Sequence, residues 1–265
     1  MKKPDYKNWV PKSMVIGLGA ATAASAGLFA LLGATDRVLK GGPRQLAAAA
    51  FGVATPVLLF YTGWMGALHR TFDYNGERQL ARTIVEGTAD FVTLPDGGTG
   101  LDVGCGSGAL TIACAKRNPG AQMLGCDIWS GAYKAVFSQK RCEENAAAEG
   151  VSNVRFEEGN AVHLPFANES FDAVTSNYVY HNIAGQNKQA LLLETLRVLK
   201  KGGTFAIHDL MSRARYGDMD AFVRKLMDAG YEDVRLIDTT DGRFMGRKEA
   251  ALLGLVGSTL LVGRK

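Results

Sequence analysis

The sequence predicts an α/β protein in which a doubly wound, mostly parallel sheet follows two membrane-spanning helices. Two uncharged runs near the start predict the helices. The later part alternates short apolar segments with helical ones, which is typical of a parallel sheet. One apolar segment, residues 99–103, runs directly into a turn with three glycines, which locates a ligand site. We therefore expect a membrane segment over 1–70 and one globular domain over 71–265.

Both uncharged runs are long enough to cross a bilayer. Residues 13–35 hold no charged side chain over 23 positions, and residues 45–68 hold none over 24. At a rise of about 1.5 Å per residue, each helix would span the roughly 30 Å hydrocarbon layer. Gly41-Gly42-Pro43 marks a turn between the runs. The sequence therefore predicts a transmembrane hairpin of two helices, at about 13–35 and 45–68.

The side chains of the two runs suit a membrane. Small residues crowd the first run and let helices approach closely in lipid, so a homo-oligomer formed through the hairpin is compatible with them. Phe60, Tyr61 and Trp64 suit an interfacial aromatic belt. Two other interpretations stay open. Residues 1–26 also resemble a secretory signal, and both runs could be buried helices of a soluble bundle.

The distribution of basic residues predicts the orientation. Seven lysines and arginines flank the hairpin outside its loop, and three lie in the loop: Lys2, Lys3, Lys7, Lys12, Arg70, Arg78 and Arg82 against Arg37, Lys40 and Arg44. Basic residues favour the cytoplasmic side. We therefore expect a protein of the cell membrane with both termini and the globular domain in the cytoplasm.

Composition excludes several classes of function. A net charge of +4 without a basic block does not favour nucleic-acid binding. The four cysteines show neither metal-ligand spacing nor a disulfide framework, so we expect no metal site.

The globular domain is expected to alternate strands and helices along its length. Strands are expected at about 99–103, 121–126, 153–157, 171–176, 204–209, 234–238 and 258–262. Helices are expected at about 77–92, 110–117, 131–148, 188–199 and 218–229. Lys200-Lys201-Gly202-Gly203 is interpreted as the signal that ends the fourth of these helices.

The glycine turn has the composition of a cofactor cradle. Glycine lets backbone come close to a ligand, and the helix that follows directs free N–H groups at it. The pattern D-x-G-x-G-x-G over 102–108 differs in spacing from the dinucleotide fingerprint. It resembles motif I of the class I methyltransferases that use S-adenosylmethionine (SAM). The resemblance implies a Rossmann-like, seven-stranded sheet, and SAM contacts from Asp102, Gly104, Cys105, Gly106 and Gly108.

An acidic residue ends the next predicted strand. Asp127 lies 21 residues after Gly106, where a carboxylate can accept both ribose hydroxyls. The alternative is that Asp127 caps a helix that starts near Ser130. In the family the residues after this acid flank the adenine ring, which here implies Ile128 and Trp129.

A third block follows at Gly159-Asn160-Ala161 and continues as HLPFANESFDAV to Val174. It resembles the G-D-A and LPF…SFD segments of type 11 methyltransferases, a group that includes quinone-ring C-methyltransferases. In that group the acid accepts from the adenine amine, and here Asn160 occupies the position beside Ala161. An amide oxygen can still accept that bond. Asn177, at the end of the fourth strand, completes the expected cofactor set.

The segment past the fourth strand is the place to expect the chemistry, because ligands bind outside the carboxyl ends of parallel strands. His181 is a candidate base, since an imidazole titrates near neutral pH. The alternative is that His181 only orders the loop. Tyr178 and Tyr180 are candidates for lining the acceptor pocket, with packing as the alternative. His208 and Asp209, past the fifth strand, are weaker candidates at the pocket mouth.

These features predict a membrane-anchored SAM-dependent methyltransferase for a lipophilic small molecule such as a quinone, a lipid, or a hydrophobic thiol or phenol. Tethering raises the local concentration of an acceptor that resides in the membrane. Two alternatives stay open: methylation of a soluble metabolite, with the hairpin used only for placement, and a SAM-binding regulator without turnover. Near the end, the basic run 243–248 and the apolar run 250–256 form either a lid or membrane-facing element that touches headgroups, or a solvated loop followed by a strand or helix of the sheet edge.

Overall fold

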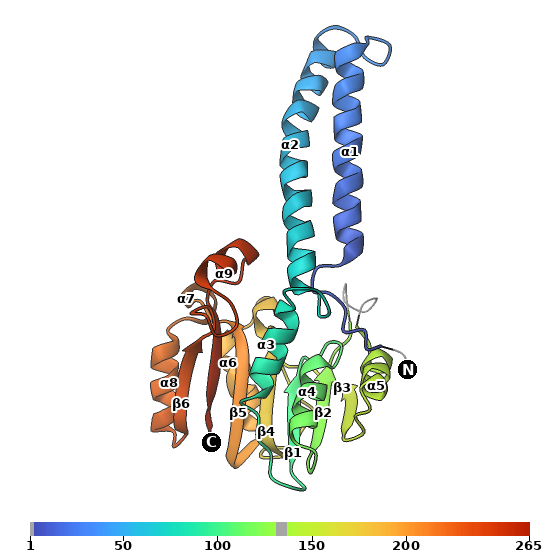
Figure 1. The fold of residues 1–265 in the computed structure, drawn as a ribbon. Helices are drawn as coiled ribbons and strands as arrows, with labels where there is room; N and C mark the ends of the chain where they lie inside the picture. Colours follow the sequence, from blue (N-terminus) through green and yellow to red (C-terminus); the bar gives the residue numbers. More distant parts are fainter. Residues whose placement is uncertain (1–2, 131–136) are drawn as a thin grey trace. The chain divides into compact units, whose positions relative to one another are not determined.

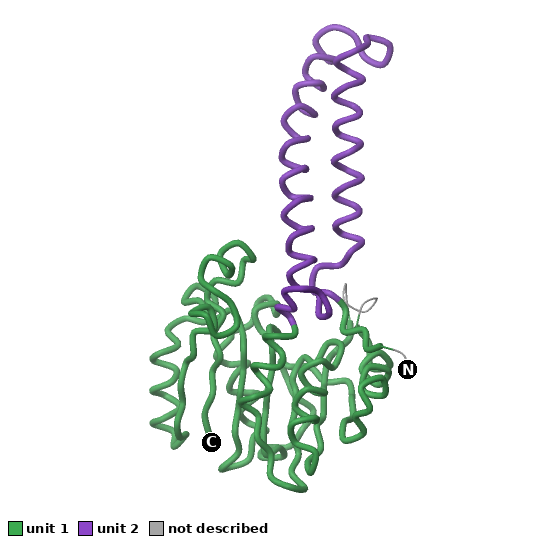
Figure 2. The backbone as a smooth tube through the Cα atoms, in the orientation of Figure 1, with its two compact units in different colours: residues 1–7, 82–265 green, residues 8–81 purple. Residues whose placement is uncertain are grey.

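A computed structural model describes residues 3–130 and 137–265. Two compact units divide the chain: Met1–Lys7 with Arg82–Lys265 form one, and Asn8–Ala81 form the other (Figure 2). We call them the sheet unit and the hairpin unit. The first residues therefore group with the sheet unit, whereas a single break near residue 70 was expected.

The hairpin unit consists of two long helices that pack side by side (Figure 1). Helix α1 spans Lys12–Ala34 and α2 spans Gly41–Phe72. The first matches the expected range, whereas the second starts earlier, inside the predicted turn. Proline is tolerated in the first turn of a helix, where its missing N–H would have no partner. Pro43 therefore does not prevent α2 from starting at Gly41.

Polar contacts join the two helices of the hairpin unit. The hydroxyls of Thr22 and Thr62 lie 2.9 Å apart, and those of Ser25 and Thr55 lie at the same distance. Interhelical hydroxyl bonds of this kind are worth about 0.6–2 kcal/mol in lipid. At the loop, the Arg44 guanidinium donates to the last carbonyls of α1, with Nε 2.6 Å from the Leu32 oxygen. Hydrogen bonds within the hairpin unit therefore hold its two helices together.

Both helices are long and apolar enough to cross a membrane, by length and composition alone. The most apolar window is 11% buried in α1 and 0% buried in α2. Core helices of a soluble bundle would be mostly buried, so this exposure does not favour that interpretation.

The sheet unit is built on a seven-stranded sheet in the order β3-β2-β1-β4-β5-β7-β6. The strands are β1 Thr99–Val103, β2 Gln122–Asp127, β3 Val154–Glu158, β4 Phe171–Asn177, β5 Leu199–Leu210, β6 Glu232–Asp238 and β7 Ser258–Arg264. Strand β7 is antiparallel to both its neighbours, and the pairs among β1–β5 are parallel. The doubly wound, mostly parallel sheet is confirmed.

Helices pack on both faces of this sheet (Figure 1). The α-helices described in this unit are α3 Leu80–Ala89, α4 Ala109–Arg117, α5 Gln139–Ala148, α6 Lys188–Arg197, α7 Arg213–Tyr216, α8 Met219–Asp228 and α9 Arg247–Leu253, of which α9 lies beyond the ends of the strands rather than on a face. Alternation along β1 assigns its side chains to the two faces. Leu101 and Val103 join a core cluster with residues of α6 and α8, while Asp102 points the other way, toward Thr111 of α4.

Two details differ from the sequence prediction. Lys200–Gly203 does not end a helix, because α6 stops at Arg197 and β5 already begins at Leu199. The pairing of β4 with β5 shifts register between Phe171 and Ala173, and this shift accommodates the two glycines of β5. The expected helix at 131–148 is observed as α5 from Gln139, and its part at 131–136 lies outside the described residues.

Candidate functional site

The turn after β1 brings backbone, rather than side chains, to the carboxyl edge of the sheet. Gly104, Gly106 and Gly108 all have positive φ angles, of 72°, 57° and 82°. A Cβ on Gly104 would lie 2.4 Å from a methyl of Val179, and one on Gly108 would lie 3.0 Å from the Phe156 ring. At Gly106 the nearest side-chain atom would be 4.0 Å away. The outer two glycines are needed for packing, and the middle one leaves its backbone accessible to a ligand.

Asp127 is fixed at the end of β2 and faces this turn. Its Oδ2 accepts from the Gly106 N–H at 2.9 Å, and its Oδ1 accepts from the Trp129 N–H at 2.9 Å. The Trp129 indole N–H in turn donates to the Gly106 carbonyl at 3.0 Å. Each carboxylate oxygen keeps a further lone pair, so Asp127 can still accept from two hydroxyls. The three residues fit a ligand that carries a ribose and a flat base.

Asp102 lies beneath the turn and is 1% exposed. Its Oδ2 accepts from the Thr111 hydroxyl at 2.6 Å. Burial raises the pKa of Asp102 to about 7, although the Thr111 hydroxyl lowers it. This carboxyl supports the turn from below, between β1 and α4.

Cys105 and Ser107 complete the turn, and the start of the chain packs against it. The Ser107 hydroxyl donates to the Tyr6 carbonyl at 2.7 Å. The Asn145 side chain of α5 accepts from the Asp5 N–H at 2.7 Å and donates to the carbonyls of Asp5 and Ser107 at 3.2 and 3.0 Å. Cys105 is 8% exposed, and burial raises the pKa of its thiol. We call Asp5, Tyr6, Ser107 and Asn145 the N-terminal clip.

The remaining expected cofactor residues surround the same edge. Ile128 is 47% exposed, and Ala161 is buried in the loop after β3. Asn160 is exposed, and its side-chain oxygen accepts from the Val162 N–H at 2.9 Å. That bond orders the loop and leaves the second lone pair of the oxygen for a ligand.

On the other side of the edge, β4 and β5 bring His181 to Asp209. The His181 ring Nδ1–H donates to Asp209 Oδ1 at 2.5 Å, and the His181 backbone N–H donates to Oδ2 at 3.1 Å. Burial alone would raise the pKa of Asp209, but the hydrogen bond and charge of His181 and the Leu210 N–H hold it below its usual value. An ionised Asp209 fixes the tautomer of His181 and leaves Nε2 as a proton acceptor.

A buried polar network lies behind His181. The Tyr178 hydroxyl and Ser258 Oγ lie 2.6 Å apart, and the centroids of the Tyr178 and His208 rings lie 4.6 Å apart. The His208 Nδ1 lies 2.8 Å from Asn177 Oδ1, and its Nε2 lies 2.9 Å from Thr239 Oγ1. Burial lowers the pKa of His208 to about 3, so this ring is neutral. Asn177, which was expected among the cofactor residues, thus turns its side-chain oxygen toward His208, and Tyr178 turns its hydroxyl toward Ser258.

Tyr180 lies in the core rather than at the pocket mouth. Its side chain is 0% exposed, and its hydroxyl lies 2.6 Å from Thr195 Oγ1 of α6. Burial raises its pKa. A fully buried ring with a satisfied hydroxyl contributes to packing and has no access to an acceptor.

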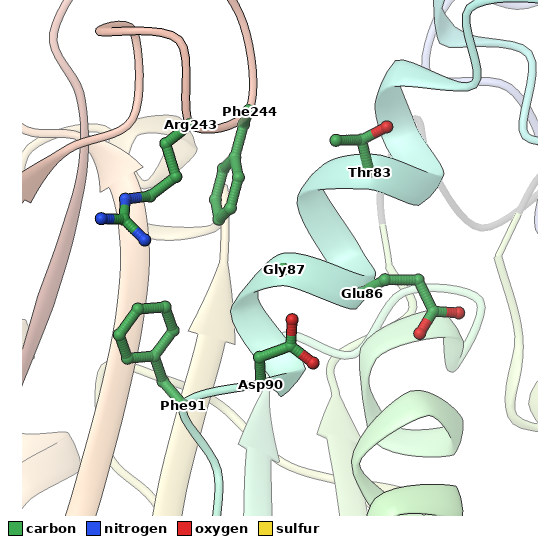
Figure 3. Close-up of a pocket in the computed structure, with 7 residues that line it drawn as sticks. All are labelled: Thr83, Glu86, Gly87, Asp90, Phe91, Arg243 and Phe244. Atoms are coloured by element: carbon green, nitrogen blue, oxygen red, sulfur yellow. The ribbon is translucent and has the colours of Figure 1, made fainter.

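A separate pocket of about 500 Å³ lies on the flank of the sheet unit (Figure 3). Its lining comes from α3 and the residues just after it, and from the connection between β6 and β7: Thr83, Glu86, Gly87, Asp90 and Phe91, with Arg243 and Phe244. Phe244 approaches α3 closely, since a Cβ on Gly87 would lie 2.3 Å from its ring. None of the glycine-turn residues lines this pocket, so we do not assign it to the cofactor. Across residues 3–130 and 137–265, no group of His, Cys, Asp and Glu side chains could hold a metal ion.

Sequence reasoning missed two features of this site. The pairing of His181 with Asp209 joins residues 28 positions apart, and the N-terminal clip joins residues 140 apart. Only the position of Asp209 at the end of a predicted strand gave a signal for the first. Nothing in the sequence gave a signal for the second.

Comparisons with known proteins agree with this geometry. The family model described as a methyltransferase domain matches residues 101–207. The chain is 36% identical over 129 residues to an arsenite methyltransferase of Halobacterium salinarum, covering 48% of this chain and 31% of that protein. It is 29% identical over 162 residues to a demethylmenaquinone methyltransferase of Geobacillus stearothermophilus, covering 57% of this chain and 66% of that protein. The chain thus spans less than two thirds of the length of these relatives.

Solved structures agree on the fold. The crystal structure of the cyclase SpnF superposes with a TM-score of 0.53 at 21% identity, covering 73% of this chain and 85% of that one. At this identity the likeness concerns the fold alone. Residues 101–207 therefore match a methyltransferase domain, and the sheet that contains them has a Rossmann-like fold.

Proposed function

We propose that the protein is a membrane-anchored methyltransferase that transfers the methyl group of SAM to a lipophilic small molecule. The observation that carries the proposal is the position of two groups on one edge of the sheet. The glycine turn with Asp127 lies after β1 and β2, and the His181–Asp209 pair lies after β4 and β5. A ligand site and a proton acceptor therefore share the edge where ligands bind in such sheets.

The cofactor side has a role for each of its residues. Asp127 would accept from the ribose hydroxyls, Gly106 would let backbone approach the ligand, and Trp129 and Ile128 would flank the adenine. Asn160 and Ala161 would border the same ring, while Asp102, Gly104, Cys105 and Gly108 shape the turn. The bound sulfonium supplies a methyl group on an excellent leaving group, so the protein mainly has to position the acceptor and exclude water.

On the acceptor side, His181 is the base. Its Nε2 takes the proton from a nucleophile that must lose one, and Asp209 stabilises the imidazolium that forms. Tyr178 and Asn177 position this side through Ser258 and His208. Tyr180 acts through packing only.

The membrane part of the proposal rests on the hairpin unit. Two apolar helices joined by hydroxyl pairs suit a lipid environment, in which helix contacts depend on small and hydroxyl side chains. The basic residues outside the loop favour a cytoplasmic sheet unit, on the side where SAM is available. The similarity to a demethylmenaquinone methyltransferase adds support for a lipophilic acceptor.

The test incubates the purified full chain with methyl-labelled SAM and an extract of native membranes. We expect label in the organic phase, and we expect its loss with His181→Asn while SAM still binds. Label confined to water-soluble products would contradict the lipophilic acceptor. If SAM binds but no component of the extract becomes labelled, the result would favour a regulator without turnover. Release of the protein by alkaline carbonate would contradict the spanning hairpin.

A further inference from the structure

Large apolar side chains are exposed at one edge of the sheet unit. Six such side chains are exposed among its described residues: Ile128, Val162, Leu193, Met227, Leu252 and Val256. The two most exposed are Leu252 in α9, at 69%, and Val256 just after it, at 64%. Ile128 follows β2 and Val162 follows β3. Four of the six therefore lie in segments that follow the carboxyl ends of strands.

These segments share an edge because of the strand directions. Strand β6 is antiparallel to β7, and β7 is antiparallel to β5, so β6 runs in the direction of β1–β5. The connection from β6 to β7, which contains α9, therefore leaves from the same edge as the glycine turn (Figure 1). We call this the carboxyl edge.

Basic side chains accompany the apolar ones on this edge. Helix α7 and residues 239–257 together carry five basic residues and two acidic ones: Arg213, Arg215, Arg243, Arg247 and Lys248 against Asp241 and Glu249. The chain just before α7 contacts the end of the second segment, because the Met211 N–H donates to the Gly257 carbonyl at 2.8 Å. Lys248 lies one helical turn before Leu252, on the same face of α9. Exposed apolar side chains, here called apolar tips, beside basic residues are typical of a surface that binds a lipid interface.

Both covalent connections to the hairpin unit start at this edge. Lys7 follows Tyr6, whose carbonyl accepts from Ser107 in the glycine turn. Arg82 lies in the first turn of α3, and the far end of α3 pairs with Arg117 through Glu86 and Asp90, at the other edge. The chain therefore leaves the sheet unit twice on the side where the apolar tips are exposed.

We propose that the carboxyl edge of the sheet unit binds the bilayer interface, with Leu252 and Val256 at the boundary of headgroups and acyl chains and the basic residues of α7 and α9 at anionic headgroups. This rests on the spanning hairpin of the proposed function. The partner is a lipid surface, since the edge joins two apolar helices and carries excess positive charge. His181 follows β4 at the same edge, so an acceptor would reach it from the membrane.

Site-specific labels test the proposal on the full chain. All four native cysteines are buried, so Val256→Cys and Leu252→Cys can be labelled selectively with the fluorophore NBD. Met227→Cys is a matched control, because Met227 is 54% exposed near the end of α8, at the other edge. In phosphatidylcholine nanodiscs with phosphatidylglycerol, labels at 252 and 256 should emit at shorter wavelength and be quenched several-fold more by nitroxide lipids than the label at 227.

The outcomes separate this proposal from the one on which it rests. Equal, water-like emission at all three positions in carbonate-resistant protein would overturn the interfacial edge and leave the hairpin intact. Labels at 252 and 256 that are shielded from both nitroxide lipids and aqueous iodide would indicate a second protein chain and would overturn the lipid partner. Release by carbonate would overturn the spanning hairpin itself.

Discussion

The cofactor side and the acceptor side of the carboxyl edge are built by different means. On the cofactor side, the ligand site depends on backbone: glycines at positive φ and one carboxylate that holds two N–H groups. On the acceptor side, it depends on side chains from distant segments that pair with each other, such as His181 with Asp209 and His208 with Thr239. A backbone site leaves a local sequence pattern, whereas a paired side-chain site does not.

The largest expected effect lies on the acceptor side. His181→Asn should lower kcat about 10²–10⁴-fold, the range for loss of a general base, and leave SAM affinity unchanged. Asp209→Asn should also lower kcat, because the His181 ring loses the carboxylate that fixes its tautomer and stabilises the imidazolium. The rates are measured with labelled SAM and membrane extract. An unchanged kcat in His181→Asn would remove the base from the mechanism.

A smaller effect is expected on the cofactor side, through backbone. Gly104→Ala places a Cβ 2.4 Å from Val179 at a φ of 72°, where a side chain costs about 1–2 kcal/mol before the overlap is counted. SAM affinity should fall about tenfold to a hundredfold, as measured by calorimetry. Gly185→Ala is the control, because its φ is also 72° but nothing lies within 4 Å. Equal SAM affinities in the two variants would contradict the close packing of the turn on Val179.

One buried group on each side should make the free energy of unfolding depend on pH, and the two dependences should have opposite signs. Folding raises the pKa of Asp102 from 3.8 to about 7, so the folded state holds this proton longer and the free energy of unfolding falls as pH rises through that window. Folding lowers the pKa of His208 from 6.5 to about 3, so the unfolded state binds its proton more readily and stability is lost as pH falls. Each contributes a slope of up to about 1.4 kcal/mol per pH unit.

Single variants separate these opposing slopes. Between about pH 4 and 6.5 the two contributions overlap with opposite sign. Asp102→Asn should therefore make stability rise more steeply with pH than in the wild type, and His208→Gln should make it fall. Unfolding of the full chain in detergent, followed by circular dichroism, measures both. Identical slopes in both variants would show that neither group is buried as described.

The smallest expected effect concerns the N-terminal clip. Asn145→Ala removes three hydrogen bonds that join Asp5 and Ser107, each worth about 1 kcal/mol or less. SAM affinity should fall about fivefold, because the glycine turn loses support on one side. Asp5→Ala is the control, since Asn145 binds only its backbone and the clip stays intact. Equal affinities in both variants would mean that the clip does not support the turn.

The accuracy of the sequence prediction follows the same division. Strands and the glycine turn were predicted correctly because their signals are local: an apolar run, three glycines and an acid at the next strand end. Lys200–Gly203 was assigned wrongly because a glycine pair occurs both at the end of a helix and in an irregular strand. Here the pairing of β5 with β4 and β7 determined the outcome.

Pairs between distant segments could not be predicted in the same way. Tyr180 is two residues from Tyr178 and looks equivalent in the sequence, yet one ring is in the core and the other faces His208. The short helix at Tyr180–Asn182 sets this difference, and it has no clear sequence signal. The Asp5–Asn145 contact depends on how the first residues return to α5, which no local pattern encodes.

The central claim is that the glycine turn and Asp127 hold SAM, with His181 acting apart from that binding. Calorimetric titration of SAM into the wild type, Asp127→Asn and His181→Asn tests it most directly. We expect binding by the wild type and His181→Asn with equal affinity, and a loss of about tenfold or more in Asp127→Asn, because charge-assisted bonds to both hydroxyls are weakened. A wild type that gives no heat with SAM, or an Asp127→Asn variant that binds as the wild type does, would contradict the account.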